Sequence, residues 1–180
     1  MFKSPILTVL ATLSTVLASC ALSTGSGMRL PDTPDIVAYC HEAFMERIDL
    51  GSADQSHGDL VTWSAEVYDH MPASGKRADG EVVGLASGYM VVTHPNHEIS
   101  KAGHEDREFR ISTMTMSWDK TGDTLLFKGL HPYAHGSARL DNHVTRAIIG
   151  GTGRFLGRSG IASVIPVADA WFRVEIYLAR

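Results

Sequence analysis

The feature that most constrains this chain of 180 residues is the glycine-rich stretch 146–160, which reads RAIIGGTGRFLGRSG. An apolar run ends in Gly-Gly-Thr-Gly at 150–153, and two more glycines follow Phe155. Glycine adopts positive φ at little cost and lets two backbone segments approach closely. The stretch therefore predicts a tight reversal of the chain between two structured segments.

Two kinds of fold place such a glycine turn after an apolar run. In a dinucleotide-binding fold the turn opens a helix, and an acidic residue follows about twenty residues later. Here residues 161–167 read IASVIPV, are rich in β-branched side chains, contain a proline and show no helical period. We therefore expect a strand, a glycine turn and a second strand, and no phosphate-binding turn.

The composition is that of one globular domain. Hydrophobic residues make up 44% of the chain and charged residues 20%, which is usual for a domain with its own core. The formal net charge is -4 and no run of basic residues occurs, so we expect no nucleic-acid partner. The 17 glycines, together with the scarcity of helical apolar patterns, favour an all-β fold.

Residues 1–19 have the pattern of a targeting segment. Lys3 precedes an apolar stretch too short to cross a bilayer comfortably, and residues 17–20, LASC, resemble the lipobox of bacterial lipoproteins. The resemblance implies cleavage before Cys20, lipidation of Cys20 and attachment to the bacterial cell envelope, at the outer membrane. An ordinary signal peptide that contains a cysteine is the alternative. Residues 20–34 suit a flexible tether.

Several segments alternate with the period of two that marks a half-buried strand. In residues 58–69, one face carries Val61, Trp63, Ala65 and Val67. In residues 109–118, one face carries Ser112, Met114, Met116 and Trp118. Residues 170–178 alternate in the same way and close the chain. These patterns predict a sheet with one apolar face.

Three of these segments resemble known families. Residues 148–160, IIGGTGRFLGRSG, resemble the GGTG-x-F motif of plant dirigent proteins and the GG-x-G-x-F motif of allene oxide cyclases. Residues 58–69, GDLVTWSAEVYD, are similar to the GDLV-x-F-x-N-x-x-Y-D strand of allene oxide cyclases. Residues 39–42, YCHE, look like the Y-x-H-D first strand of dirigent proteins. The resemblance covers residues 35–180 and implies a small eight-stranded antiparallel β-barrel that forms a homotrimer.

The first expected strand, 36–44, contains the candidate catalytic residue. Its apolar pattern fits a helix or a strand, and the resemblance decides for a strand. At period two, Cys40, Glu42 and Phe44 share a face. A carboxylate that faces an apolar interior is costly unless it is paired or used, and the matching acids in both families are implied to act on the substrate. An outward Glu42 on an exposed face is the alternative.

An eight-stranded barrel has an interior just wide enough for side chains or for one small ligand. Alternation and the resemblance together predict an apolar pocket there. Several of its expected wall residues are methionines, whose flexible side chains adapt to irregular ligands. The alternative is a core that these side chains simply fill. The expected ligand-binding residues are Val61, Trp63, Ala65, Met90, Met114, Met116 and Tyr133.

Four departures limit what the resemblance implies about the substrate. The acid and the arginine that follow GGTG in coupling dirigent proteins are Arg154 and Ser159 here. The pocket asparagine and cysteine of allene oxide cyclases are Ala65 and Met90. Neither lignan-type coupling nor a jasmonate-type substrate is therefore implied.

The histidines do not predict a metal site. His94 and His97, with His104 nearby, and the pair His131 and His135 have conceivable spacings. Zinc needs three or four convergent ligands, however, and pairs in polar loops are usually solvated. We therefore expect neither a metal nor another cofactor.

The sequence thus predicts a cofactor-free cyclase or isomerase. Its barrel would confine a small hydrophobic, reactive ligand and direct its cyclisation or stereochemistry. A non-catalytic carrier or sensor of an apolar molecule is one alternative, and a structural envelope lipoprotein is another. The first needs an acid in the pocket, the second needs only an apolar cavity, and the third needs a filled interior.

Overall fold

A computed structural model describes residues 31–51, 56–94, 107–134 and 140–180. The signal peptide expected over residues 1–19, Cys20 and most of the expected tether lie outside these described residues. In the part of the chain that is described, no helix is long and apolar enough to span a membrane.

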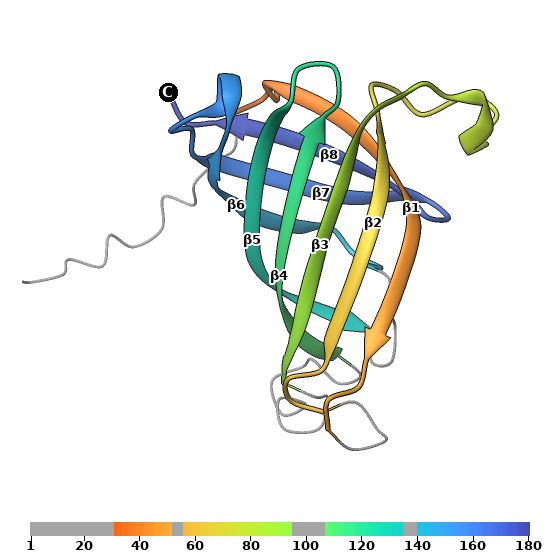
Figure 1. Cartoon of the computed structure of the whole chain (residues 1–180), viewed down its shortest axis with the longest axis vertical. Helices are drawn as coiled ribbons and strands as arrows, with labels where there is room; N and C mark the ends of the chain where they lie inside the picture. Colours follow the sequence, from red (N-terminus) through yellow and green to blue (C-terminus); the bar gives the residue numbers. More distant parts are fainter. Residues whose placement is uncertain (1–30, 52–55, 95–106, 135–139) are drawn as a thin grey trace, which may run out of the picture. The chain divides into compact units, whose positions relative to one another are not determined.

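Eight antiparallel strands, each hydrogen-bonded to the next in sequence order, close into a barrel when β8 pairs with β1. This confirms the predicted fold class. The strands are β1 (Ile36–Ile48), β2 (Leu60–Tyr68), β3 (Val82–His94), β4 (Arg107–Trp118), β5 (Asp123–Ala134), β6 (Val144–Gly151), β7 (Gly160–Ala168) and β8 (Trp171–Leu178). Figure 1 shows β1 to β5 side by side on the near face, with β6, β7 and β8 passing behind them.

Because successive strands run in opposite directions, their connections lie alternately at the two ends of the barrel. The connections β2–β3, β4–β5 and β6–β7 lie at one end, which we call the turn end. The connections β1–β2, β3–β4 and β5–β6 lie at the other, which we call the loop end. At the turn end the interior is filled by large side chains, among which Trp118 and Phe155 have ring centres 5.3 Å apart.

The glycine-rich stretch forms the reversal between β6 and β7, as predicted. The two strands are joined by a turn that contains a short 3-10 helix, Gly153–Phe155, and no α-helix follows it. Phe155 is buried in the core, and the Thr152 N–H donates to the Thr124 carbonyl. The segment therefore closes the turn end of the barrel, and it does not have the helix that a dinucleotide turn requires.

The first strand corrects one prediction about faces. The pairing of β1 with β2 changes register between Glu42 and Phe44, so that one extra residue is inserted into β1. Beyond this bulge the alternation is inverted. Phe44 therefore does not share the inner face with Cys40 and Glu42, and 52% of it is exposed. Met45 faces the interior in its place.

Candidate functional site

A cavity of about 60 Å³ lies inside the barrel, between the packed turn end and the loop end. All eight strands contribute to its wall, as expected for a closed barrel whose alternate residues point inward. Its lining residues are Cys40, Glu42, Met45, Trp63, Ala65, Met90, Met114, Tyr133, Leu140, Arg146, Val164, Phe172 and Val174.

Most of the residues predicted from the sequence meet at this cavity. The structure brings together Glu42, Trp63, Ala65, Met90, Met114 and Tyr133 on its wall. The other two predicted ligand-binding residues point inward but are buried away from the cavity. Val61 packs against Met90 and Tyr133, and Met116 belongs to the filled core of the turn end.

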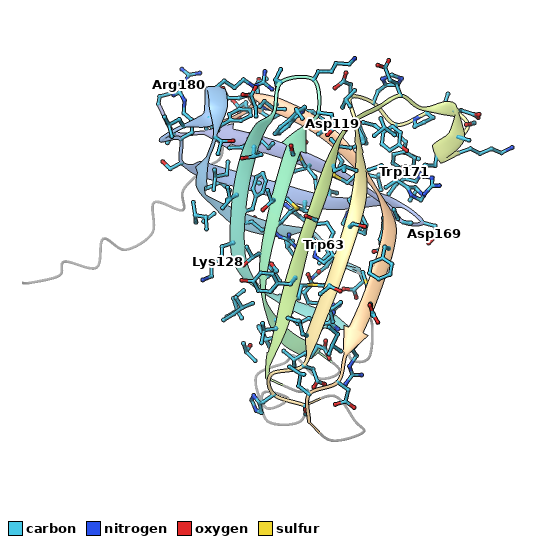
Figure 2. The ribbon with its side chains drawn as sticks, viewed as in Figure 1. Trp63, Asp119, Lys128, Asp169, Trp171 and Arg180 are labelled. Atoms are coloured by element: carbon cyan, nitrogen blue, oxygen red, sulfur yellow. The ribbon has the colours of Figure 1, made fainter. Side chains whose placement is uncertain are left out.

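Trp63 forms part of the cavity wall because its neighbour on β3 has no side chain. Trp63 lies within the barrel (Figure 2) and is paired with Gly88. A Cβ atom at position 88 would lie 2.9 Å from Cζ2 of the indole and would overlap the Thr113 carbonyl oxygen on β4. Gly88 therefore leaves the space that this indole occupies.

Glu42 is half-buried and lines the cavity at the place where the seam between β1 and β8 ends. Regular pairing with β8 extends from Ile36 to His41, and the Glu42 N–H then donates to the Ala170 carbonyl at 2.9 Å. The backbone of the candidate acid is thus held between β2, where it pairs with Ala65, and the turn that precedes β8. The bulge that follows directs Met45 into the wall beside it.

Arg146 is a lining residue that was not predicted from the sequence. It lies in β6 between Val144 and Ile148, and all three side chains are buried on the inner face. The signal was present in the sequence, because an arginine placed two residues from β-branched residues on each side shares their face of a strand. Arg146 is only 4% exposed.

The surroundings of Arg146 disfavour its charge. Burial lowers the pKa of the guanidinium. The Tyr133 hydroxyl and the Cys40 thiol act in the opposite direction and raise it. One nitrogen, Nη1, donates to the sulfur of Met114 at 3.6 Å, and the Tyr133 hydroxyl accepts a second hydrogen bond. The Nε atom has no hydrogen-bond partner among the described residues.

The two weak acids beside Arg146 are uncharged at neutral pH. Burial raises the pKa of the Cys40 thiol to about 12, although Arg146 acts in the opposite direction. Burial also raises the pKa of Tyr133, against the influence of Arg146 and Arg110. Cys40 is therefore a thiol, and a thiol is a poor nucleophile.

His131 lies next to this group on β5 and is also uncharged. Burial, and then the charge of Arg146, lower the pKa of the imidazole to about 4. Its Nε2 atom has no hydrogen-bond partner in the described part of the chain. His135, with which His131 forms one of the two histidine spacings in the sequence, lies outside the described residues, as do His97 and His104 of the other. The described His, Cys, Asp and Glu residues contain no group of three that could hold a metal.

Behind Tyr133, the loop end contains a buried ion pair. Arg110 donates to the Glu108 carboxylate, and its Cζ atom lies 4.4 Å from the centre of the Tyr133 ring. Both charged side chains are at most 1% exposed. The pair packs behind the phenol that borders the cavity.

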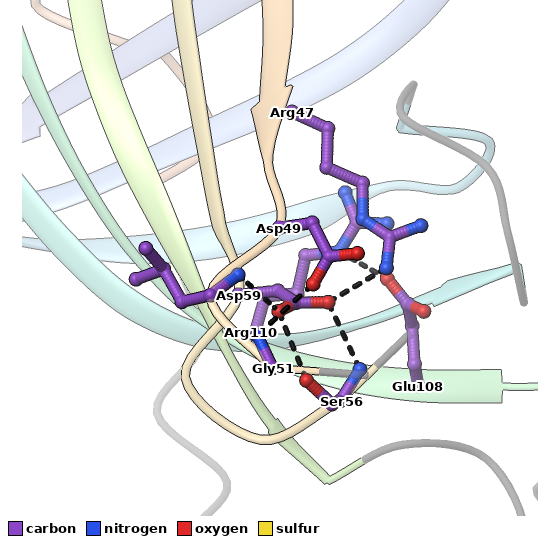
Figure 3. Close-up of polar contacts among 8 residues, drawn as sticks. Arg47, Asp49, Gly51, Ser56, Asp59, Glu108 and Arg110 are labelled. Atoms are coloured by element: carbon purple, nitrogen blue, oxygen red, sulfur yellow. Dashed lines mark hydrogen bonds and ion pairs between the residues drawn. The ribbon is translucent and has the colours of Figure 1, made fainter. Parts of the chain in front are cut away.

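A second polar group at the loop end is centred on Asp59 (Figure 3). Its carboxylate accepts hydrogen bonds from Arg47 Nη2 at 2.6 Å, from the Leu50 N–H at 3.1 Å, and from both the N–H and the hydroxyl of Ser56. Burial favours the neutral acid, but these donors outweigh burial and lower the pKa of Asp59. The carboxylate therefore ties the β1–β2 connection to the start of β2.

No protein-family model matches the chain, and no curated protein matches it in sequence. Solved structures are similar. Pyocyanin demethylase has a TM-score of 0.59 at 20% identity, over 80% of this chain and 98% of that one. The pterocarpan synthase dirigent protein GePTS1 has a TM-score of 0.55 at 18% identity, over 79% and 82%. The chain has the dirigent-type barrel fold.

A third similar structure widens the range of reactions associated with this fold. The Diels Alderase AbmU from Streptomyces koyangensis has a TM-score of 0.53 at 18% identity, over 80% of this chain and 63% of that one. At 18 to 20% identity these likenesses establish the barrel. They leave the chemistry to be argued from the cavity itself.

Proposed function

We propose that this barrel is a cofactor-free cyclase or isomerase that encloses one small hydrophobic molecule and uses Glu42 as its acid or base. The observation that supports this most directly is the position of Glu42 on the wall of a largely apolar cavity. A positioned carboxylate can take a proton from a reacting carbon or oxygen atom and return it elsewhere on the same molecule. Substrate and product then contain the same atoms, so the reaction needs no co-reactant.

The cavity supplies the second requirement, which is confinement. Trp63, Met45 and Phe172 present flat and adaptable apolar surfaces to a ligand. Holding a flexible substrate in a folded conformation removes much of the entropic barrier to ring closure. A fold that also occurs in a pterocarpan synthase dirigent protein and a Diels Alderase is consistent with such a role.

The test exploits the fact that isomerisation leaves the mass unchanged. The purified protein is incubated with an extract of small apolar metabolites, and bound and released compounds are compared by liquid chromatography and mass spectrometry. We expect at least one compound to return with the same mass and a new retention time. Glu42→Gln should still bind that compound but should convert it at least a hundredfold more slowly, the order of effect of general acid–base catalysis.

Glu46→Gln is the matched control, because Glu46 lies on the same strand and is exposed. It should convert the compound at the wild-type rate. If wild type and both variants release the bound compound unchanged, the protein is a carrier. That second function is favoured by the apolar character of most of the wall, since binding alone needs no acid.

A further inference from the structure

The position of Arg146 indicates which kind of apolar molecule the cavity accepts. A buried charge is costly unless it is paired and hydrogen-bonded. In the part of the chain that the structure describes, no salt bridge joins Arg146 to a carboxylate, and the groups that favour its charge are the neutral Tyr133 hydroxyl and Cys40 thiol. The fold therefore retains a charge in the cavity wall at a cost to its own stability.

The other fully buried arginine shows the contrast. Arg110 is ion-paired with Glu108 two residues before it on the same strand, so its charge is compensated within the protein. Arg146 instead has Met114 sulfur, which is a weak acceptor, as the partner of Nη1. The Nε donor has no partner among the described residues.

Two side chains that carry hydrogen-bond donors lie next to each other on the cavity wall. Arg146 and Tyr133 both line it. A hydroxyl that accepts a hydrogen bond from a guanidinium keeps its own proton to donate. A guanidinium N–H and a phenol O–H from adjacent side chains together form a site for one negatively charged oxygen.

We propose that the ligand is a small apolar molecule with a single oxyanion, such as a carboxylate, a phenolate or an enolate, which Arg146 and Tyr133 bind. This inference rests on the proposed function only in so far as the cavity receives a small apolar ligand. The remaining wall, with Trp63, Met45 and Phe172, suits the apolar body of such a molecule. Arg146 is then a binding residue, and Glu42 remains the group that moves protons.

The test compares acids with their neutral esters on the full-length protein. Benzoate, 1-naphthoate and their methyl esters are titrated by calorimetry at pH 7.5 into wild type, Arg146→Met and Arg158→Met. Wild type should prefer each acid to its ester by about tenfold to a hundredfold, the effect of a hydrogen bond to a charged group. Arg146→Met should lose this preference. Arg158 is exposed outside the cavity, so Arg158→Met should keep it.

A stability measurement separates ligand binding from a structural role. Without ligand, Arg146→Met should melt at the wild-type temperature or higher, because methionine fills the site without a buried charge. A lower melting temperature together with a retained acid preference would mean that Arg146 serves the fold, and the inference would be wrong. If Arg146→Met does not fold, Tyr133→Phe provides the same comparison, and it should lower the acid preference about tenfold.

The remaining outcomes are equally decisive. If wild type binds acid and ester with equal affinity, the oxyanion inference is overturned while the proposed cyclase or isomerase function stands. If wild type prefers the acids but Glu42→Gln converts its natural ligand normally, the proposed use of Glu42 is wrong and the inference stands. If neither acids nor esters bind, the cavity does not receive this class of molecule and the inference is wrong.

Discussion

The Cζ atom of Arg110 lies 4.4 Å from the centre of the Tyr133 ring, and the hydroxyl of the same tyrosine accepts a hydrogen bond from Arg146. One arginine therefore contacts the ring and the other contacts the hydroxyl. Because Arg110 is also paired with Glu108, the buried ion pair of the loop end is connected to the cavity wall through a single side chain. This arrangement gives Tyr133 little freedom to turn.

The ion pair behind Tyr133 should be sensitive to the loss of one partner. Arg110→Met removes the arginine from a buried carboxylate, and breaking such a pair costs about 3 to 5 kcal/mol. We expect the free energy of unfolding, measured by urea denaturation at pH 7, to fall by an amount of this order. The double variant Glu108→Gln/Arg110→Met should regain at least half of the loss, because it no longer buries a carboxylate that has lost its pairing with Arg110. Equal losses in the single and double variants would contradict this account.

Asp59 should make stability depend on pH in the acid range. Its pKa is lowered in the folded protein, so the ionised group stabilises the fold above the usual aspartate pKa of about 4, and this contribution is lost as the pH falls below that value. We expect Asp59→Asn to lower the free energy of unfolding by about 1.5 to 3 kcal/mol at pH 7.

The difference between wild type and Asp59→Asn should stay constant from pH 7 to about 5 and should shrink below about pH 4. Urea denaturation over this range measures it. Asp49 is the matched control, because it is exposed and, among the described residues, accepts a hydrogen bond from the Gly51 N–H (Figure 3). Asp49→Asn should show a smaller effect at every pH. A difference for Asp59→Asn that grows on acidification would refute the assignment.

Alanine substitutions at two glycines of the β6–β7 turn should distinguish the cost of backbone strain from the cost of steric overlap. Gly153 and Gly157 have φ values of 58° and 72°, so alanine at either position is strained by about 1 to 2 kcal/mol. A Cβ atom at 153 would also overlap the Asp123 carboxylate, whereas one at 157 would meet nothing within 4 Å. Thermal denaturation should therefore show a loss for Gly153→Ala that is at least twice that for Gly157→Ala. Equal losses would mean that Asp123 moves aside freely.

Cys20 should be the acylated first residue of the mature protein. The prediction comes from the LASC sequence at 17–20 after an apolar stretch, and it concerns residues outside the described part of the chain. Membrane-extracted protein should have an intact mass that lacks residues 1–19 and includes acyl chains, which hold a protein at a membrane when two or more are present. Soluble protein with an unmodified Cys20 thiol would disprove it.

Alternation along single strands predicted which side chains of several strands face the interior, and the family resemblance implied the closed barrel. Trp63 and Ala65 on β2, like Met114 on β4, follow the period of two, and a regular strand allows no other distribution of faces. The glycine turn at 150–153 was likewise readable, because β-branched residues follow it. These are local properties, and local geometry determines them.

What the sequence did not determine is the position of each side chain along the barrel and the places where the alternation breaks. Met116 has the same face as Met114, yet it lies in the filled turn end. The period of a strand tells which side a residue faces, and its height depends on how the strands are staggered. That stagger is a property of the closed sheet.

The bulge in β1 and the surroundings of Arg146 also depend on how the strands pair in the closed sheet. The extra residue after Glu42 exists only relative to the register of β2, and it exchanges Phe44 for Met45 in the interior. The sequence of β6 placed Arg146 on the inner face, whereas the Tyr133, Met114 and Cys40 side chains that surround it come from other strands. The sequence by itself determined most strands and their faces, because alternation is local, and only closure of the sheet brought the buried Arg146 and the Glu42 carboxylate to the same cavity.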